Sequence, residues 1–206
     1  MMLFNNPFYQ TSLNYQGKEA LIQTITNEYE KAPSKKPSSW EENVHTSILY
    51  EACKNNLDYF EKAGIPLDLV VETDKVVQDF VTDLGISSIG KFYIAEMWYN
   101  AYSRSQYQQM HKHSNKSNMM FSGVYFMKFN QETHSATRFY NPYFEIDFDK
   151  VQDNPFFITS PKVKEDDVFI FPADVGHDVL EQTADDLRIT VAFNVACTFN
   201  EKFTYE

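Results

Sequence analysis

The chain has 206 residues, of which 43% are hydrophobic and 16% aromatic, and its formal net charge is -11 at pH 7. This length suits one domain with a sizeable core, and the composition excludes disordered and collagen-like chains. The negative charge argues against nucleic acid as a partner, because an acidic surface repels phosphate.

Cysteine usage and the lack of apolar runs indicate a cytoplasmic protein. Cys53 and Cys197 form no C-x-x-C pair, so we interpret them as reduced, buried thiols. The first residues lack a signal-peptide pattern, and no run approaches the roughly 20 apolar residues that span a bilayer. We therefore expect no membrane partner. The oligomeric state stays open, with a homodimer as one alternative.

The N-terminal part carries helical periodicity. Leu21, Ile25 and Tyr29 recur at spacings of four, which predicts a helix over residues 18–32. Residues 39–48 fit either a helix start with a capping box or a short alternating strand, and both alternatives stay open.

Two further helices are predicted to end at glycines. One covers residues 49–63 before Gly64, and the other covers residues 66–84 before Gly85. Glycine suits the left-handed position that follows many helices. The first 85 residues are therefore predicted to be mostly helical.

From Gly90 onward the apolar period falls to two, which is typical of strands. The predicted strands are residues 92–102, 119–129, 136–140, 156–163, 167–171 and 187–197. Many short strands separated by turns indicate a sandwich or jelly roll. Helices followed by strands predict an α+β fold in a single domain of residues 1–206, with the β core over residues 90–200.

Three of the five histidines form a candidate metal site. His111 and His113 are two residues apart and would share one face of a strand, and His177 follows a strand that ends in proline and glycine turn residues. Three protein ligands leave open positions on the metal, as catalytic sites require. The alternative is that they are ordinary polar histidines, which is our interpretation of His45 and His134.

Arg188 and Thr190 are predicted to share a strand face opposite the apolar Ile189, Val191 and Phe193. An arginine that points into a strand-built interior needs a partner for its charge. That partner is either an acidic side chain or a carboxylate ligand held by the guanidinium and the hydroxyl. The pattern favours neither alternative.

Four segments together resemble a known family. They are H-K-H, S-G-V-Y-F, F-I-F-P-A-D-V-G-H and R-I-T-V-A-F-N, within residues 92–197. They resemble the 2-oxoglutarate/iron(II) oxygenases of marine phages and bacteria, in the prolyl-4-hydroxylase-like branch of the double-stranded β-helix superfamily. The resemblance implies a cupin-like jelly roll with N-terminal helices packed against it.

The resemblance also implies roles for individual residues. His111, His113 and His177 would bind iron(II), and Arg188 with Thr190 would bind the distal carboxylate of 2-oxoglutarate. Tyr102 and Tyr125 would contact the same co-substrate, with core packing as their alternative role. These assignments imply a dioxygenase, a hydroxylase of unknown substrate, that couples oxidative decarboxylation of 2-oxoglutarate by O2 to substrate oxidation. A viral chain would act in the host cytoplasm.

One residue departs from the family pattern. The usual facial triad is two histidines and a carboxylate, and His113 stands at the position of the carboxylate. Either three histidines bind the metal, which we favour, or Asp174 or Asp178 supplies the carboxylate. Functional alternatives are a cupin-like three-histidine dioxygenase that does not use 2-oxoglutarate, a zinc hydrolase, and a non-enzymatic β-sandwich binding or virion module.

Overall fold

The computed structural model describes residues 7–48, 57–113, 118–143 and 157–200. Within these ranges the helices are α1 (Lys18–Lys31), α2 (Leu57–Lys62) and α3 (Leu67–Asp83). The strands are β1 (Tyr9–Ser12), β2 (His45–Thr46), β3 (Gly90–Tyr102), β4 (Gln108–His111), β5 (Met119–Lys128), β6 (Thr137–Tyr140), β7 (Ile158–Thr159), β8 (Asp167–Pro172), β9 (His177–Val179) and β10 (Arg188–Phe199).

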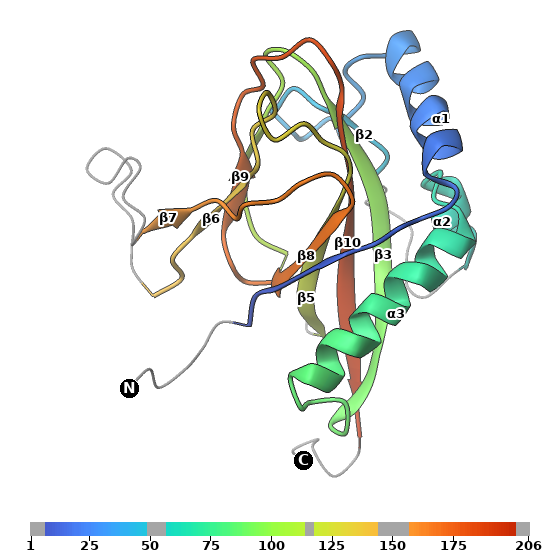
Figure 1. Ribbon diagram of the computed structural model, residues 1–206, viewed down its shortest axis with the longest axis vertical. Helices are drawn as coiled ribbons and strands as arrows, with labels where there is room; N and C mark the ends of the chain where they lie inside the picture. The colour runs from blue at the N-terminus through green and yellow to red at the C-terminus, as the bar shows by residue number, and fades with distance from the viewer. Residues whose placement is uncertain (1–6, 49–56, 114–117, 144–156, 201–206) are drawn as a thin grey trace.

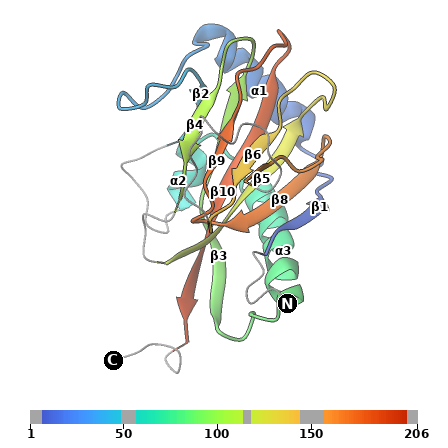
Figure 2. The same ribbon diagram turned by 90° about the vertical axis from the view of Figure 1, so that its left-hand side faces the viewer.

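Two antiparallel sheets form a jelly-roll core (Figures 1 and 2). The larger sheet has the order β1-β8-β5-β10-β3-β2, and the smaller has the order β4-β9-β6-β7. In Figure 1 the smaller sheet lies to the left of the larger one, and the three helices flank the larger sheet on its other side. The chain thus forms three layers, consistent with burial of apolar faces between packed elements.

The larger sheet is buried on both faces. One face carries Met97, Ile189 and Phe193, which belong to the same buried cluster as Leu69 and Val77 of α3. The face toward the smaller sheet packs a second cluster of large apolar side chains: Val124, Phe126, Phe129, Phe139, Val163, Phe169, Phe171 and Val175. This second face is where polar residues of β3 and β10 line a cavity.

The helices agree closely with the expected ranges. Helix α1 matches the amphipathic segment that begins at residue 18, with Leu21 and Ile25 buried. Gly64 and Gly85 adopt positive φ angles of 68° and 74°, as expected for glycines after helix ends. The predicted second helix is described only from residue 57, and its earlier part lies outside the described residues.

The structure decides or corrects the expectation for three short segments. Residues 39–48 contain strand β2, which pairs with β3, so the strand alternative is the correct one. Strand β1 joins the larger sheet beside β8, although the opening of the chain shows no strand pattern. The expected strand over residues 156–163 is short, because only Ile158–Thr159 pairs with β6.

The cysteines and the lengths of the helices can also be compared with the expectations. Cys197 is a buried free thiol, as predicted, and Cys53 lies outside the described residues. In the described ranges no helix is long and apolar enough to cross a membrane.

Candidate metal and co-substrate site

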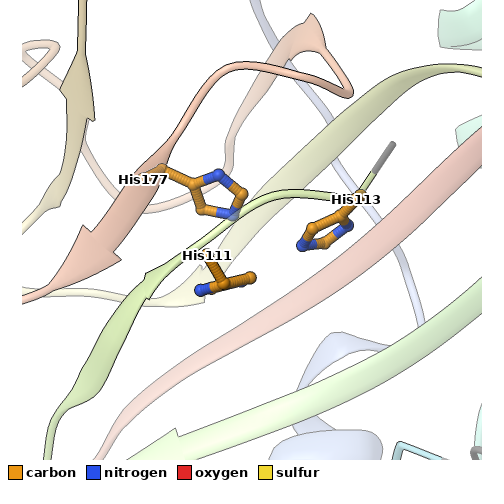
Figure 3. Close-up of side chains that lie close together, drawn as sticks. All are labelled: His111, His113 and His177. Carbon is orange, nitrogen blue, oxygen red and sulfur yellow. The ribbon is translucent and has the colours of Figure 1, made fainter. Parts of the chain in front are cut away.

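Three imidazoles meet between the sheets (Figure 3). One potential ligand atom from each of His111, His113 and His177 lies within 4.8 Å of the others. His111 of β4 and His177 of β9 are direct cross-strand partners. His113 lies just beyond the end of β4, contrary to the expectation of one strand through both residues, and its backbone N–H donates to the carbonyl oxygen of Ala173 at 2.8 Å.

Hydrogen bonds set the same tautomer on all three rings. Each Nδ1 faces an oxygen: Gln109 O for His111 at 2.8 Å, Asn194 Oδ1 for His113 at 2.6 Å, and Val175 O for His177 at 3.0 Å. These oxygens accept, so each neutral ring carries its proton on Nδ1 and its lone pair on Nε2. Such bonds to the distal nitrogen orient metal-ligating histidines in general.

Burial also favours the neutral form of His111 and His177. It lowers the pKa of His111 below its ordinary value, and it lowers the pKa of His177 well below that value, with further lowering by the nearby His111 and His113 rings. Neutral imidazole is the form that binds a metal. An ion bonded at about 2.1 Å separates neighbouring ligand nitrogens by roughly 3.0 to 3.4 Å. The donor set therefore fits an imidazole-binding metal such as iron after small ring rotations.

Arg188 supplies a buried positive charge in the same cavity. Its side chain is 1% exposed, and its Nε and Nη1 atoms have no hydrogen-bond partner among the described residues. Nη2 lies 3.4 Å from Thr137 Oγ1, and the guanidinium lies 5.0 Å from the centroid of the Tyr102 ring. Burial lowers the pKa of Arg188 to about 10, so the group stays protonated at neutral pH. No acidic side chain of the described residues pairs with it.

A small cavity of about 20 Å³ lies among these groups. Its walls are formed by Trp98, Asn100, Tyr102, Gln108, His111, His113, Gly123, Val124, Thr137, Phe171, His177, Val179, Arg188, Thr190 and Ala192. Arg188, Thr190 and Ala192 alternate along β10 and face the same space, as the strand period predicts. Tyr102 is the cross-strand partner of Arg188, and its hydroxyl donates to Gln108 Oε1 at 2.9 Å.

Two polar groups of this cavity were not predicted from the sequence. Trp98 and Asn100 lie on β3, and Trp98 Nε1 and Asn100 Oδ1 are buried without hydrogen-bond partners among the described residues. Buried polar atoms are normally paired. Because the cavity lies beside them, both can bond a ligand. The usable signal was that Trp98 and Asn100 lie four and two residues before Tyr102, so all three share one face of the strand.

Tyr125 does not lie in the cavity, so the expectation that it contacts a co-substrate is wrong. Its side chain belongs to the core on the helix-facing side of the sheet, and its hydroxyl donates to Asp166 Oδ1 at 3.0 Å. Sequence alternation along β5 did not reveal this, because nearly every residue of the strand is buried.

Neither aspartate offered as an alternative ligand joins the histidines. Asp178 accepts hydrogen bonds from Arg138 and Tyr140, and Asp174 is exposed. The other two histidines are ordinary buried residues. His45 Nδ1 lies 2.7 Å from Ala32 O, and His134 Nε2 lies 3.0 Å from Asp186 Oδ2.

Comparison with known sequences agrees with this geometry. Residues 96–194 match the family described as "Putative 2OG-Fe(II) oxygenase", where 2OG is 2-oxoglutarate. This region, just under half of the chain, is similar to the 2OG-Fe(II) oxygenases. Members of that family are oxidoreductases that use iron(II), 2-oxoglutarate, O2 and a second substrate. No curated protein matches the chain.

Solved structures share the fold of this chain at low sequence identity. A Pseudomonas putida prolyl-4-hydroxylase has a TM-score of 0.60 and 11% identity, with 94% of each chain covered. The viral collagen prolyl hydroxylase vCPH from Paramecium Bursaria Chlorella virus-1, solved with 2OG, has a TM-score of 0.58 and 10% identity, over 94% of this chain and 98% of that one. The non-heme alpha-ketoglutarate-dependent carbocyclase SnoK from nogalamycin biosynthesis has a TM-score of 0.62 and 9% identity, over 93% of this chain and 80% of that one. The predicted α+β fold with a jelly-roll core is thereby confirmed.

Proposed function

We propose that this oxygenase hydroxylates an organic substrate and couples that reaction to the oxidative decarboxylation of 2-oxoglutarate. In the proposal His111, His113 and His177 hold iron(II), and Arg188 binds the co-substrate. Two solved structures that share the fold are prolyl hydroxylases and a third is a carbocyclase, so the fold is compatible with hydroxylation.

The three histidines would hold the metal through Nε2. Their Nδ1–H groups are already bonded to Gln109, Val175 and Asn194, so the lone pairs do not need a change of tautomer before binding. Iron(II) bound there would supply the redox chemistry that activates O2. With three protein ligands, positions on the metal stay open for other molecules.

Arg188 and Thr190 would hold the distal carboxylate of 2-oxoglutarate. A guanidinium offers paired N–H donors that match a carboxylate, and two of its nitrogens have no protein partner among the described residues. Thr190 is buried beside it and can add a hydroxyl donor. Tyr102 packs against the guanidinium and limits its motion. A bound carboxylate would therefore neutralise a charge that the protein leaves uncompensated.

The remaining walls would keep bulk water away from the reacting groups. Val124, Phe171 and Val179 give apolar surface to the cavity next to the histidines. A largely closed apolar wall favours reaction with the bound substrate over loss to solvent.

One observation carries the proposal: an unpaired buried guanidinium shares a cavity with three imidazoles. A three-histidine dioxygenase that does not use 2-oxoglutarate has no need for that buried charge. The same holds for a zinc hydrolase and for a binding module with incidental histidines.

O2 consumption and succinate formation test the proposal. Wild-type protein with iron(II) should consume O2 only when 2-oxoglutarate is added, with succinate formed in step. Arg188→Met should raise the KM for 2-oxoglutarate at least roughly 100-fold, since loss of a charge-assisted pair costs several kcal/mol. Tyr125→Phe is the control and should leave that KM unchanged, because Tyr125 lies on the other sheet face. If the wild-type protein consumes O2 at the same rate with and without 2-oxoglutarate, the proposal is contradicted.

A further inference from the structure

The carboxylate of Glu96 is linked to His113 through one intervening side chain, that of Asn194. His113 stands at the position where the family has a carboxylate ligand. Asn194 Oδ1 accepts a hydrogen bond from His113 Nδ1 at 2.6 Å and another from Ser122 Oγ at 2.8 Å. On the other side of the amide, Asn194 Nδ2 donates to Glu96 Oε2 at 2.8 Å. Asn194 is buried, and it is the cross-strand partner of Glu96 on β3 and of Ser122 on β5.

We propose that Glu96 is a positioning residue that acts through Asn194 to hold His113 in the tautomer that binds metal. The inference rests on the proposed function, because it assigns His113 to the metal. It adds two residues that touch neither the metal nor the co-substrate. We call Glu96, Asn194 and His113 the relay.

The donor and acceptor roles along the relay follow from the carboxylate. An ionised glutamate has only acceptors, so the end of the Asn194 amide that faces Glu96 must be its NH2 group. The oxygen of the amide is then turned toward His113 and can only accept. His113 must therefore carry its proton on Nδ1, which leaves the lone pair of the neutral ring on Nε2.

Removal of the charge would permit the opposite arrangement. A neutral amide at position 96 can donate as well as accept, so the Asn194 amide could turn around and present its NH2 group to His113. The ring would then accept at Nδ1 and carry its proton on Nε2, and that tautomer has no lone pair for the metal. The carboxylate thus excludes the tautomer that cannot bind.

Two further contacts restrict the His113 ring without touching its nitrogen atoms. Trp98 lies with its ring centroid 5.7 Å from that of His113, at an interplanar angle of 30°. The backbone N–H of His113 is bonded to Ala173 O. Neither contact involves a ring nitrogen of His113, whereas the hydrogen bond to Asn194 Oδ1 fixes the proton on Nδ1.

Anaerobic calorimetric titration of the whole chain with iron(II) tests the relay. Glu96→Gln should weaken iron(II) binding roughly tenfold, the lower end of the effect of changing groups that support metal ligands. The matched control is Glu28→Gln, which makes the same change of charge. Glu28 accepts from the hydroxyl of Tyr99, on the helix-facing side of β3, and this variant should bind iron(II) like the wild type.

A second readout needs no metal. Nitrogen-15 NMR of histidine-labelled, metal-free protein should show the Nδ1–H tautomer at His113 in the wild type and a mixture of tautomers in Glu96→Gln. Unchanged iron(II) affinity in Glu96→Gln, or an Nε2–H tautomer at His113 in the wild type, overturns the relay. Undiminished iron(II) affinity in His113→Ala instead overturns the assignment of His113 to the metal, so the two failures are distinguishable.

Discussion

Arg188 combines a binding role with a cost in stability. The guanidinium is buried and has no acidic partner among the described residues, so the ligand-free protein must hold a desolvated charge. Arg138 offers the contrast within the same molecule, because it forms a salt bridge with the buried Asp178. The same residue type thus has opposite consequences at the two positions.

We expect Arg188→Met to stabilise the ligand-free protein by about 1 to 3 kcal/mol, since an apolar side chain of similar length removes a buried charge. Arg138→Met should instead destabilise the protein, because it leaves the carboxylate of Asp178 buried without this partner. Urea unfolding of metal-free protein without 2-oxoglutarate measures both changes. Destabilisation by Arg188→Met would mean that the charge is compensated within the protein.

At the level of residues, the sequence predicted several of the side chains that line the cavity, but it did not place Tyr125 correctly. Alternation places Arg188 and Thr190 on one face, and the structure puts both in the cavity with the three histidines. That these residues bind metal and 2-oxoglutarate stays a prediction. Tyr125 could not be placed, because β5 is largely apolar on both faces and only Ser122 marks the inner one.

Between elements, contact of β5 with β10 depends on a glycine. A Cβ atom at Gly123 would lie 2.1 Å from Cζ of Phe193, the residue opposite it in the ladder. The phenylalanine ring occupies the space beside the glycine, which brings the two strands together behind the cavity. The positions of the polar groups that line the cavity therefore depend on packing at the helix-facing side of the same sheet.

Gly123→Ala should therefore destabilise the protein by roughly 1 to 3 kcal/mol, the usual range for overpacking a core. Phe193→Leu in the same chain should restore part of that loss, because the smaller side chain vacates the space. A double-mutant cycle of unfolding free energies measures the coupling. Strict additivity of the two changes would show that Phe193 is not the obstacle.

At the level of elements, long segments were predictable and short ones were not. Helix α3 and strands β3, β5 and β10 carry enough periodic residues to be recognised. Strand β9 has only 3 residues and β1 only 4, too few for a period to show. The register of β10 is also irregular between Asn194 and Val195. The pairing of Asn194 with Glu96 therefore could not be predicted by counting residues along the two strands.

Across the whole molecule, acid should destabilise the metal-free fold. Burial is the main cause that lowers the pKa of four histidines: His45, His111, His134 and His177. The unfolded chain has a histidine pKa of about 6.5 and binds more protons than the fold as the pH falls below that value. Stability is thus fully present above pH about 6.5 and declines below it, by at most about 1.4 kcal/mol per pH unit for each such histidine.

Urea unfolding in EDTA at pH 7.5 and at pH 5.5 measures this decline, in a window above the main titration of carboxylates. The free energy of unfolding should be lower at pH 5.5. An equal or higher value there would show that the histidines are accessible to protons in the fold.

The layered architecture was predictable because helical and strand periods are separated along the chain, near residue 85. Motifs far apart in the sequence indicated the family, and the matched region contains all of the candidate site residues. The relay was not predictable, since a hydrogen-bonded glutamate and asparagine carry no sequence pattern of their own.

The most direct test of the account is an anaerobic optical titration of the wild-type protein with iron(II) and 2-oxoglutarate together. A metal held by the three histidines with the 2-oxo acid chelated to it should give a visible charge-transfer absorption. That absorption should be lost in His177→Ala and should need far more 2-oxoglutarate in Arg188→Met. Wild-type protein that binds iron(II) and 2-oxoglutarate without this absorption, or that binds neither, would contradict the account.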